Sequence, residues 1–417
     1  MNAVAPVIKS FGCRLNIAES EAIRAALASS SDPRALVVVN GCAVTGNAMR
    51  EARTAVRRAR REHPHARIVA TGCAAQVDPD GFAVMPEVDL VLGNAEKLDA
   101  ASYARNERVV VGDIMALTRT APQMVPAFSS HARAFLEVQN GCDHRCTFCI
   151  IPFGRGPSRS VPVEATVEAA QRLVAGGHRE LVLTGVDLTS YGHDLPGAPT
   201  LADLIAALLV RVQGLERIRL GSVDVAEIDA PLFELLTGEP RMMPHIHLSL
   251  QHGDDLILKR MKRRHSRTQA VAMVERLKTM RAEIAIGADL IAGFPTENEA
   301  AAAANASLIA DCDIVFAHIF PYSPREHTPA ARMPQLSRET IKARAAALRG
   351  VGAAHRSKWL ASQVGTIRPV LIERDGISGH ADSFARVRLI APAPAGEVAR
   401  VRILGVDGDA LIGEGAA

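Results

Sequence analysis

The chain has 417 residues, 48% of them hydrophobic and 22% charged, which is an ordinary balance for globular proteins. This length exceeds one compact core, so we expect two or three domains. Because 48 basic and 45 acidic side chains leave a net charge of only +3, any nucleic-acid binding must depend on where the charges lie rather than on their sum.

Membrane insertion and export are not expected. No apolar run approaches the roughly 20 residues that span a bilayer, and the first residues, "MNAVAPVIKSFG", lack the basic and then apolar pattern of a signal peptide. Seven cysteines, an odd number, are poorly explained by disulfides in such a chain. We therefore expect a cytoplasmic protein, without a membrane partner, that uses cysteine for metal binding or catalysis.

The first hundred residues alternate short β-rich runs with helical stretches, which predicts a parallel α/β sheet. Cys13, Cys42 and Cys73 each follow one of the β-rich runs. Because ligands bind at the carboxyl ends of strands in such sheets, the three cysteines can converge into one site. The runs are "VIKSFG", "ALVVVN" and "ARIVATG", and the helical stretches between them are 16–29 and 46–63.

A loosely patterned, proline-containing segment at 119–133 is predicted to be a linker. After it, six further β-rich runs alternate with helical segments at 163–175, 200–212 and 267–281. Six units in this span predict a partial (β/α)6 barrel with its chemistry at the strand carboxyl ends. The predicted strands are "AFLEVQ", "ELVLTGV", "RIRLGSV", "HIHLSLQ", "IAIGADLIAGF" and "IVFAHIFPY".

The end of the chain has a different texture. A helix-rich segment from Ser337 leads into runs of near-alternating apolar residues interrupted by Gly and Asp, which predict a small antiparallel β-barrel. Cys312 stands apart from the other cysteines, and we interpret it as a small buried hydrophobic residue.

The stretch "NGCDHRCTFC" places Cys142, Cys146 and Cys149 within eight residues. Structural zinc takes four ligands, and no second cysteine pair lies near, although His144 could complete such a site. An iron–sulfur cluster held by three thiolates instead leaves one iron open to a substrate or cofactor. We therefore favour an iron–sulfur cluster over zinc.

This CxxxCxxC pattern resembles the radical S-adenosylmethionine (SAM) enzymes, in which the open iron of a 4Fe-4S cluster binds SAM. The resemblance extends to "LTGVD", "SLQHGD" and "GADLIAGFPTE", which match strand ends that contact SAM in that family. It implies the cofactor-binding residues Phe148, Thr184, Gly185, Ser249, Gln251 and Arg260.

Over nearly its whole length the chain resembles the methylthiotransferases within that superfamily. The match rests on "FGCRLNIAESE", "VVNGCAVTGNAMREARTAVRRA" and "ATGCAAQ", and on a final barrel like the TRAM RNA-binding module. It implies an N-terminal methylthiotransferase domain at 1–118, a radical SAM barrel at 134–358 and a TRAM domain at 359–417. It also implies a second 4Fe-4S cluster at Cys13, Cys42 and Cys73.

Within this family, "LTGVDLTSYG" and "HIFPYSPREHTPAARMP" look most like the branch that acts on N6-threonylcarbamoyladenosine beside the tRNA anticodon. The implied partners are tRNA, a sulfur donor and an electron donor such as flavodoxin or ferredoxin. Two departures are visible: Gly41 stands where Thr is common, and His252 where Ser is common. The alternatives are the isopentenyladenosine branch, the branch that modifies a ribosomal-protein aspartate, and a non-catalytic, metal-stabilised RNA-binding protein.

Two basic surfaces are candidates for RNA contact. On a helix over 46–63 the periodicity places Arg50, Arg53, Arg57 and Arg61 opposite an apolar face. Such a stripe is either a solvated surface or a set of phosphate contacts, and the family resemblance favours the contacts. In the tail, Arg386 and Arg388 lie on a predicted strand, and Phe384 is the main aromatic residue available for base stacking.

Overall fold

The computed structural model describes residues 5–28, 35–120, 128 and 131–416. Its N-terminal part is a five-stranded parallel sheet with strands in sequential order. Thr45 caps α2 by accepting a hydrogen bond from Ala48 N, and Ala52, Val56 and Ala59 bury the apolar face of that helix. The strands are β1 (Val7–Ser10), β2 (Leu36–Gly41), β3 (Arg67–Gly72), β4 (Leu90–Leu92) and β5 (Val109–Val110); the helices are α1 (Arg14–Leu27), α2 (Gly46–Glu62), α3 (Cys73–Val77) and α4 (Pro79–Ala83), with 3-10 turns at Glu96–Leu98, Ala100–Ala104 and Ile114–Ala116.

The central part is the open barrel that the sequence predicts. Its parallel strands form two ladders, β6-β9-β10 and β11-β12-β13-β14, and Gly221 links β10 to β11. The strands are β6 (Arg133–Glu137), β9 (Glu180–Thr184), β10 (Arg217–Leu220), β11 (Ser222–Val223), β12 (His245–Gln251), β13 (Ala285–Ala292) and β14 (Ile314–Pro321), with a small antiparallel pair of β7 (Gln139–Asn140) and β8 (Arg159–Ser160).

Helices cover the outside of this barrel, and alternate strand residues such as Ile286, Ala288 and Leu290 join them in the largest apolar core. Cys312 is buried in this core, as predicted. The helices are α5 (Ile151–Arg155), α6 (Val163–Ala175), α7 (Leu201–Arg211), α8 (Ala230–Gly238), α9 (Asp255–Arg260), α10 (Arg267–Met280), α11 (Glu299–Asp311) and α12 (Arg338–Ser362), with 3-10 turns at Leu188–Ser190, Val225–Glu227 and Pro329–Arg332.

The C-terminal part is a closed five-stranded barrel in the order β15-β16-β17-β19-β18. The prediction of a purely antiparallel barrel is wrong at one seam, because β17 pairs with β19 in parallel to close the sheet. Its strands are β15 (Ile367–Ile372), β16 (Ser378–Ala381), β17 (Arg386–Leu389), β18 (Val398–Asp407) and β19 (Ala410–Gly415). Helix α12 continues past residue 359, and its Leu360 packs into the small barrel's core.

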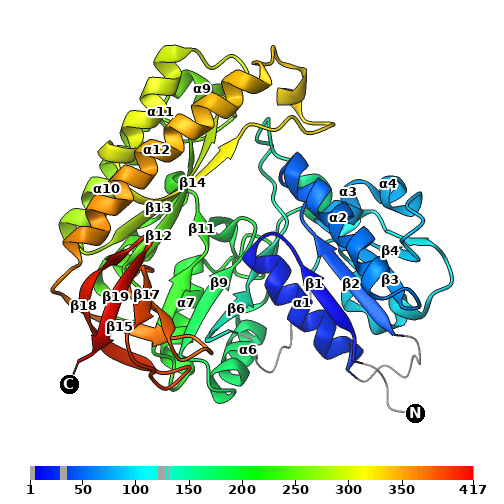
Figure 1. Cartoon of the computed structure of the whole chain (residues 1–417), viewed down its shortest axis with the longest axis horizontal. Helices are drawn as coiled ribbons and strands as arrows, with labels where there is room; N and C mark the ends of the chain where they lie inside the picture. The colour runs from blue at the N-terminus through cyan, green and yellow to red at the C-terminus, as the bar shows by residue number, and fades with distance from the viewer. Residues whose placement is uncertain (1–4, 29–34, 121–127, 129–130, 417) are drawn as a thin grey trace.

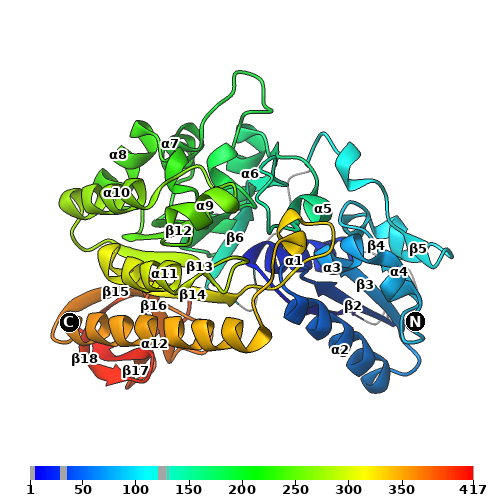
Figure 2. The same ribbon diagram turned by 90° about the horizontal axis from the view of Figure 1, so that it is seen from above.

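Figures 1 and 2 show how these parts meet: the N-terminal sheet lies beside the open side of the central barrel, and α12 runs along β14 toward the small barrel. Most of the predicted linker, residues 121–127 and 129–130, falls outside the described residues. Phe128, within the linker, is buried edge-on against Phe135 with ring centroids 5.7 Å apart. No helix in the described part of the chain is both long and apolar enough to cross a bilayer.

Phe384 is the point where the three parts converge. The guanidinium carbons of Arg14, Arg133 and Arg219 lie 5.3, 5.3 and 5.0 Å from its ring centroid. The ring of His245, the first residue of β12, lies 4.8 Å from the same ring at a tilt of 41°. Phe384 is therefore partly buried at the amino-terminal end of the central barrel, in contact with these side chains.

Candidate metal centres

The three early cysteines lie together at the carboxyl edge of the N-terminal sheet. Cys13 precedes α1, Cys42 follows β2, and Cys73 begins α3 after β3. Gly12 has φ +118°, and a Cβ there would lie 2.5 Å from Cys42 Cβ, so only glycine allows this approach. The convergence expected from the βα spacing is therefore present.

Burial strongly affects the thiols of this set. Cys42 and Cys73 are buried, whereas Cys13 is exposed. Burial, helped by the neighbouring Cys73, raises the pKa of Cys42 to about 12. Such a thiol keeps its proton at neutral pH unless a metal ion displaces it.

A buried cationic network surrounds the Cys73 thiol. Arg155 Nε donates to Cys73 Sγ at 2.9 Å, and the carboxylate of Glu19 binds Arg155, with Nη2 to Oε2 at 3.1 Å. Lys97 Nζ lies 2.6 Å from the same carboxylate oxygen, and all three charged side chains are buried. Two cations against one carboxylate leave a net positive charge beside the thiols, which suits an anionic metal–thiolate centre.

Asparagines complete the surroundings of this set. Cys13 Sγ donates to Asn16 Oδ1 at 3.1 Å, which also accepts from Arg155 Nη2 at 3.2 Å. Asn94 Nδ2 lies 3.6 Å from Cys73 Sγ. Sequence reasoning did not identify Arg155, Glu19, Lys97 or these asparagines. Only the position of Arg155, a few residues after Cys149, was a signal that could have found one of them.

The second cysteine set occupies the loop between β7 and α5. Cys142 N donates to Gly156 O at 3.1 Å, and Cys149 N donates to Cys146 O at 3.1 Å, so the backbone itself shapes the loop. Arg263 Nη1 lies 3.6 Å from Cys146 Sγ. Burial raises the pKa of Cys149 to about 12 and also raises that of Cys142. These thiols, too, need a metal centre in order to ionise.

His144 does not join its neighbouring cysteines as a fourth ligand. Its Nε2 lies 2.9 Å from Asp187 Oδ2 and 3.7 Å from Glu227 Oε1. These hydrogen bonds raise the pKa of His144 to about 10, so the ring is a cation at neutral pH. Because its near contacts are carboxylates, His144 is not placed as a fourth ligand of the cysteine set.

The predicted SAM residues lie on the strand ends around this loop. Thr184 ends β9, Gly185 follows it, and Ser249 and Gln251 end β12. Arg263 ties β12 to the cysteine loop, because its Nη2 donates to Ser249 O at 2.8 Å. Phe148, beside Cys149, is half-buried against an apolar cluster, and Arg260 Nη1 donates to Thr296 Oγ1 at 2.6 Å.

Gly41, the first departure from the family pattern, has a packing reason. A Cβ at residue 41 would lie 2.9 Å from Ala52 Cβ and 3.1 Å from Ala74 Cβ. Helices α2 and α3 therefore approach β2 too closely for a threonine at this position.

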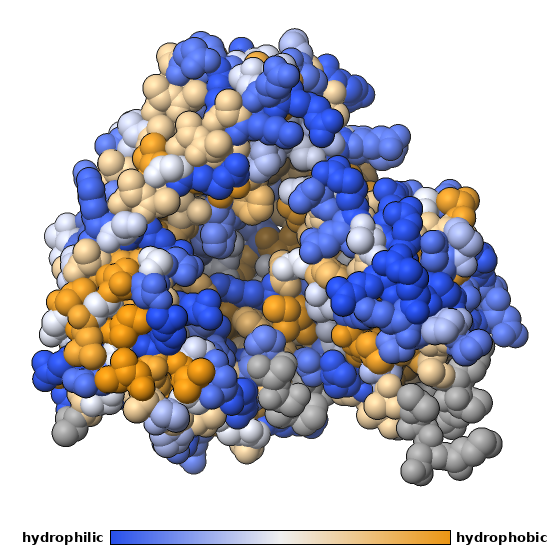
Figure 3. Space-filling model, viewed as in Figure 1, coloured by the Kyte–Doolittle hydropathy of each residue, from blue (hydrophilic) through white to orange (hydrophobic). Residues whose placement is uncertain are grey.

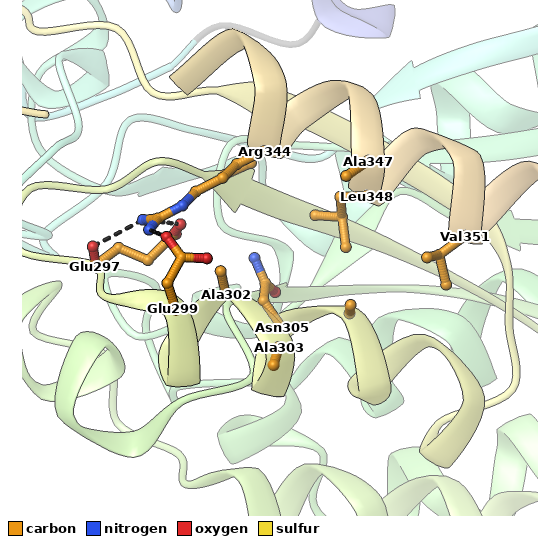
Figure 4. A pocket seen from close by; sticks show the side chains of 11 residues that line it. Glu297, Glu299, Ala302, Ala303, Asn305, Arg344, Ala347, Leu348 and Val351 are labelled. Carbon is orange, nitrogen blue, oxygen red and sulfur yellow. Dashed lines mark hydrogen bonds and ion pairs between the residues drawn. The ribbon is translucent and has the colours of Figure 1, made fainter. Parts of the chain in front are cut away.

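His252, the second departure, is buried, and its Nε2 lies 3.0 Å from Glu297 Oε2. Figure 4 shows that Glu297 also binds Arg344, which crosses a pocket between α11 and α12. His252 therefore anchors the end of β12 to the segment that follows β13.

The arginines of the two predicted RNA-binding surfaces differ in whether they already have a hydrogen-bond or ion-pair partner. Arg57 and Arg61 are exposed and have no ion-pair partner in the described part of the chain. Arg50 donates to Asn47 Oδ1 at 2.7 Å, and Arg53 is paired with Asp78. In the small barrel, Arg386 and Arg388 are both exposed, and Arg388 is paired with Asp407.

Each cysteine set thus offers three thiols, and the seventh cysteine of the described chain, Cys312, lies in the apolar core and joins neither set. This donor chemistry fits a 4Fe-4S cluster with one open iron.

Comparison with known proteins agrees with these observations. Residues 136–309 match the radical SAM superfamily, and residues 6–93 match a family described only as uncharacterized protein family UPF0004. The chain is 45% identical over 401 residues to the threonylcarbamoyladenosine tRNA methylthiotransferase MtaB of Rickettsia prowazekii, covering 96% of this chain and 95% of that protein. It is 35% identical over 382 residues to MtaB of Aquifex aeolicus, covering 88% and 92%.

Among solved structures, the radical SAM methyltransferase TsrM from Kitasatospora setae has the same fold in part, with a TM-score of 0.53 at 17% identity, covering 74% of this chain and 68% of that one. The chain matches enzymes over nearly its whole length, and it carries two cysteine sets at strand ends. These findings argue against the alternative of a non-catalytic RNA-binding protein. The chain belongs to the radical SAM methylthiotransferases, transferases that work with SAM and iron–sulfur clusters.

Proposed function

We propose that this protein inserts a methylthio group at C2 of N6-threonylcarbamoyladenosine, next to the anticodon of a tRNA, using two 4Fe-4S clusters. Cys142, Cys146 and Cys149 would hold one cluster and SAM, and Cys13, Cys42 and Cys73 the other. When bound, the first cluster with SAM supplies a carbon radical that activates the adenine, and the second carries the sulfur.

The observation that carries this proposal is the direct link between the two cysteine sets. The chain leaves Cys149, forms the single-turn helix α5, and ends that helix at Arg155, which hydrogen-bonds to Cys73. Gly154, in the same helix, lies close enough that a Cβ would be 3.3 Å from Cys73 Cβ. A radical generated beside one set and a sulfur held at the other would therefore be close neighbours.

Protein side chains would contribute charge and water exclusion. Arg155 and Lys97 place positive charge at the sulfur-carrying set, where thiolates and sulfide are anionic. Asp187 Oδ2, which lies 3.6 Å from Cys142 Sγ, fixes His144 as a cation at the mouth of the other set. These groups are positioned in advance, so no reorganisation is needed when substrate binds.

The interior of the central barrel supports threonylcarbamoyladenosine over isopentenyladenosine. His247, Asp289 and His318 lie on adjacent strands and contact one another, with His247 Nε2 to Asp289 Oδ1 at 3.0 Å and His318 Nδ1 to the same oxygen at 3.4 Å. An isopentenyl group is apolar and could form no hydrogen bond with this polar cluster, whereas a threonylcarbamoyl group is polar and anionic and could do so.

Mass spectrometry of tRNA nucleosides from a deletion strain tests this proposal. Loss of the methylthio form of threonylcarbamoyladenosine, with restoration by the wild-type chain, is the expected result. Loss of the methylthio form of isopentenyladenosine, or an unchanged nucleoside profile with a modified ribosomal-protein aspartate missing, would contradict it.

The proposal includes further partners and a location. A reductant such as flavodoxin or ferredoxin would reduce the clusters, and a separate sulfur donor would replenish the consumed sulfur. The exposed Arg57 and Arg61 on α2, together with Arg386 and Arg388 on β17, would contact tRNA phosphates. Such a reaction on tRNA takes place in the cytoplasm.

A further inference from the structure

One cation at the barrel interior has no compensating partner. Arg14 begins α1, which packs against β6, and its guanidinium carbon lies 5.3 Å from the Phe384 ring centroid. Among the described residues no hydrogen bond or ion pair satisfies this half-buried guanidinium. Because Arg14 is only partly buried and none of its nitrogens is a buried atom without a partner, its guanidinium can exchange water for an anionic ligand.

The two neighbouring arginines differ from Arg14 in this respect. Arg133 pairs with Glu373 at 3.2 Å, and Arg219 Nε pairs with Glu180 at 2.9 Å. Among the described residues, Arg14 is thus the one arginine of these three without an ion-pair partner, and its contact is with the Phe384 ring.

The barrel interior near Arg14 is open. Arg14 and His245 both contact the Phe384 ring, at 5.3 and 4.8 Å from its centroid, and His247, two residues along β12 from His245, lies 4.6 Å from the His318 ring. The side chain of His318 is 56% exposed although it lies on a barrel strand. Figure 3 shows a hollow at the centre of this face, where Figure 1 places the gap between the barrel strands and the N-terminal sheet.

We infer that Arg14 binds the carboxylate of the threonylcarbamoyl group of the substrate and that His318 contacts the polar part of the same group. This inference rests on the proposed function, since that carboxylate is the only charge on the modified base. A guanidinium pairs with a carboxylate through two parallel hydrogen bonds. Because Arg14 directly follows Cys13, an anion bound there lies beside the set proposed to carry sulfur.

A purely structural role for Arg14 makes a different prediction. If Arg14 served only to clamp α1 onto Phe384, its removal would lower stability and weaken all RNA ligands equally. If Arg14 instead binds a substrate anion, its removal takes away a positive charge near two other arginines. The thermal midpoint of the variant should then be unchanged or higher. The two roles can therefore be separated by measuring stability and selectivity on the same variants.

The test is equilibrium binding of anticodon stem-loops to the full-length, anaerobically reconstituted protein, followed by fluorescence anisotropy. The ligands carry threonylcarbamoyladenosine, the same nucleoside with its carboxylate converted to a neutral amide, or isopentenyladenosine. The variants are Arg14→Gln, Arg14→Lys and Arg24→Gln, the last being a control on the same helix that is paired with Glu21 at 3.4 Å.

We expect wild type and Arg24→Gln to prefer the carboxylate over the amide by at least about tenfold in Kd, which is about 1.4 kcal/mol. Arg14→Gln should bind the carboxylate and the amide stem-loops with the same Kd, and its thermal midpoint should not fall. Arg14→Lys should show an intermediate preference, because lysine keeps the charge but lacks the two parallel N–H donors of a guanidinium. An Arg14→Gln variant that keeps the wild-type preference, or that loses stability and affinity for every stem-loop, overturns the inference. If wild type does not prefer threonylcarbamoyladenosine to isopentenyladenosine, the proposed substrate fails, and this inference fails with it.

Discussion

Arg155 Nε lies 2.9 Å from Cys73 Sγ, although 82 residues separate the two in the chain. Arg155 belongs to the central barrel and Cys73 to the N-terminal sheet, so this contact joins one part of the chain to the metal centre of another. The carboxylate of Glu19 binds the guanidinium, and Lys97 in turn binds that carboxylate.

Arg155→Gln should lower stability and impair metal loading together. It leaves Glu19 buried with one cation fewer, and breaking such a pair costs about 3–5 kcal/mol. Urea unfolding measures the stability, and iron analysis after reconstitution should show a deficit confined to the N-terminal set. In the triple variant Glu19→Gln, Lys97→Met, Arg155→Gln this buried network carries no charge, so stability should recover while the iron deficit stays. Full iron content in the triple variant would show that Arg155 acts only through folding.

Cysteine variants should separate the two proposed clusters. Cys142→Ala should abolish SAM cleavage, whereas Cys13→Ala should keep cleavage but form no methylthio product. Each should lose about half the iron, because the sets are independent ligand groups. Product analysis by mass spectrometry, with Cys312→Ala as the control, checks this prediction. Normal methylthio formation by Cys13→Ala would remove the basis for the second cluster.

Gly41→Thr should destabilise the N-terminal sheet by about 1–3 kcal/mol, because overpacking forces side chains and backbone to shift. The new side chain would meet Ala52 and Ala74. Gly238→Thr is the matched control, since nothing lies within 4 Å of a Cβ there. Thermal unfolding followed by circular dichroism compares the two. Equal midpoints for both variants would mean that α2 and α3 can move apart freely.

Replacing Arg57 and Arg61 by Gln should weaken tRNA binding and flatten its salt dependence. Each lost phosphate contact reduces the slope of log K against log salt by about 0.7–0.9. Filter binding over a salt series measures the slope. Arg172→Gln on α6 serves as the control, because that exposed arginine is already paired with Glu168 at 2.7 Å. If the double variant has the wild-type slope of log K against log salt, Arg57 and Arg61 face solvent and do not contact tRNA.

The buried pair of Arg219 and Glu180 should make stability depend on pH. Burial alone would raise the pKa of Glu180, but Arg219 lowers it to about 2 from a normal 4.5. A lowered carboxyl pKa stabilises the fold above pH 4.5, and this stabilisation is lost as pH falls toward 2. The shift corresponds to stabilisation on the order of 3 kcal/mol.

Arg219→Met should therefore destabilise the protein at pH 7, because Glu180 keeps only the longer pair with Arg217 at 3.5 Å, and the deficit should shrink near pH 5, where Glu180 takes up a proton more readily. Urea unfolding at both pH values measures the deficit. Arg179→Met is the control, because its pair with Glu216 at 3.2 Å is exposed on both sides and surface pairs contribute little. A deficit that is the same at both pH values would contradict the assignment to Glu180.

The sequence alone predicted the main strands of each part, the longer helices α1, α2, α6, α7, α10 and α12, and the two sets of three cysteines, as well as the apolar and basic faces of α2. These features depend on periodicity and turn residues within short windows, and parallel βα repeats return the chain to one edge at regular intervals.

Only the tertiary structure decided which charges are balanced. The pairing of Arg155 with Cys73 and Glu19, the contacts of Phe384 at the barrel end, and the lack of an ion-pair partner for Arg14 among the described residues each depend on different parts of the chain. The parallel seam between β17 and β19 likewise follows from barrel closure. Charge compensation and ring closure are set by distances in space, and local sequence patterns carry no information about them.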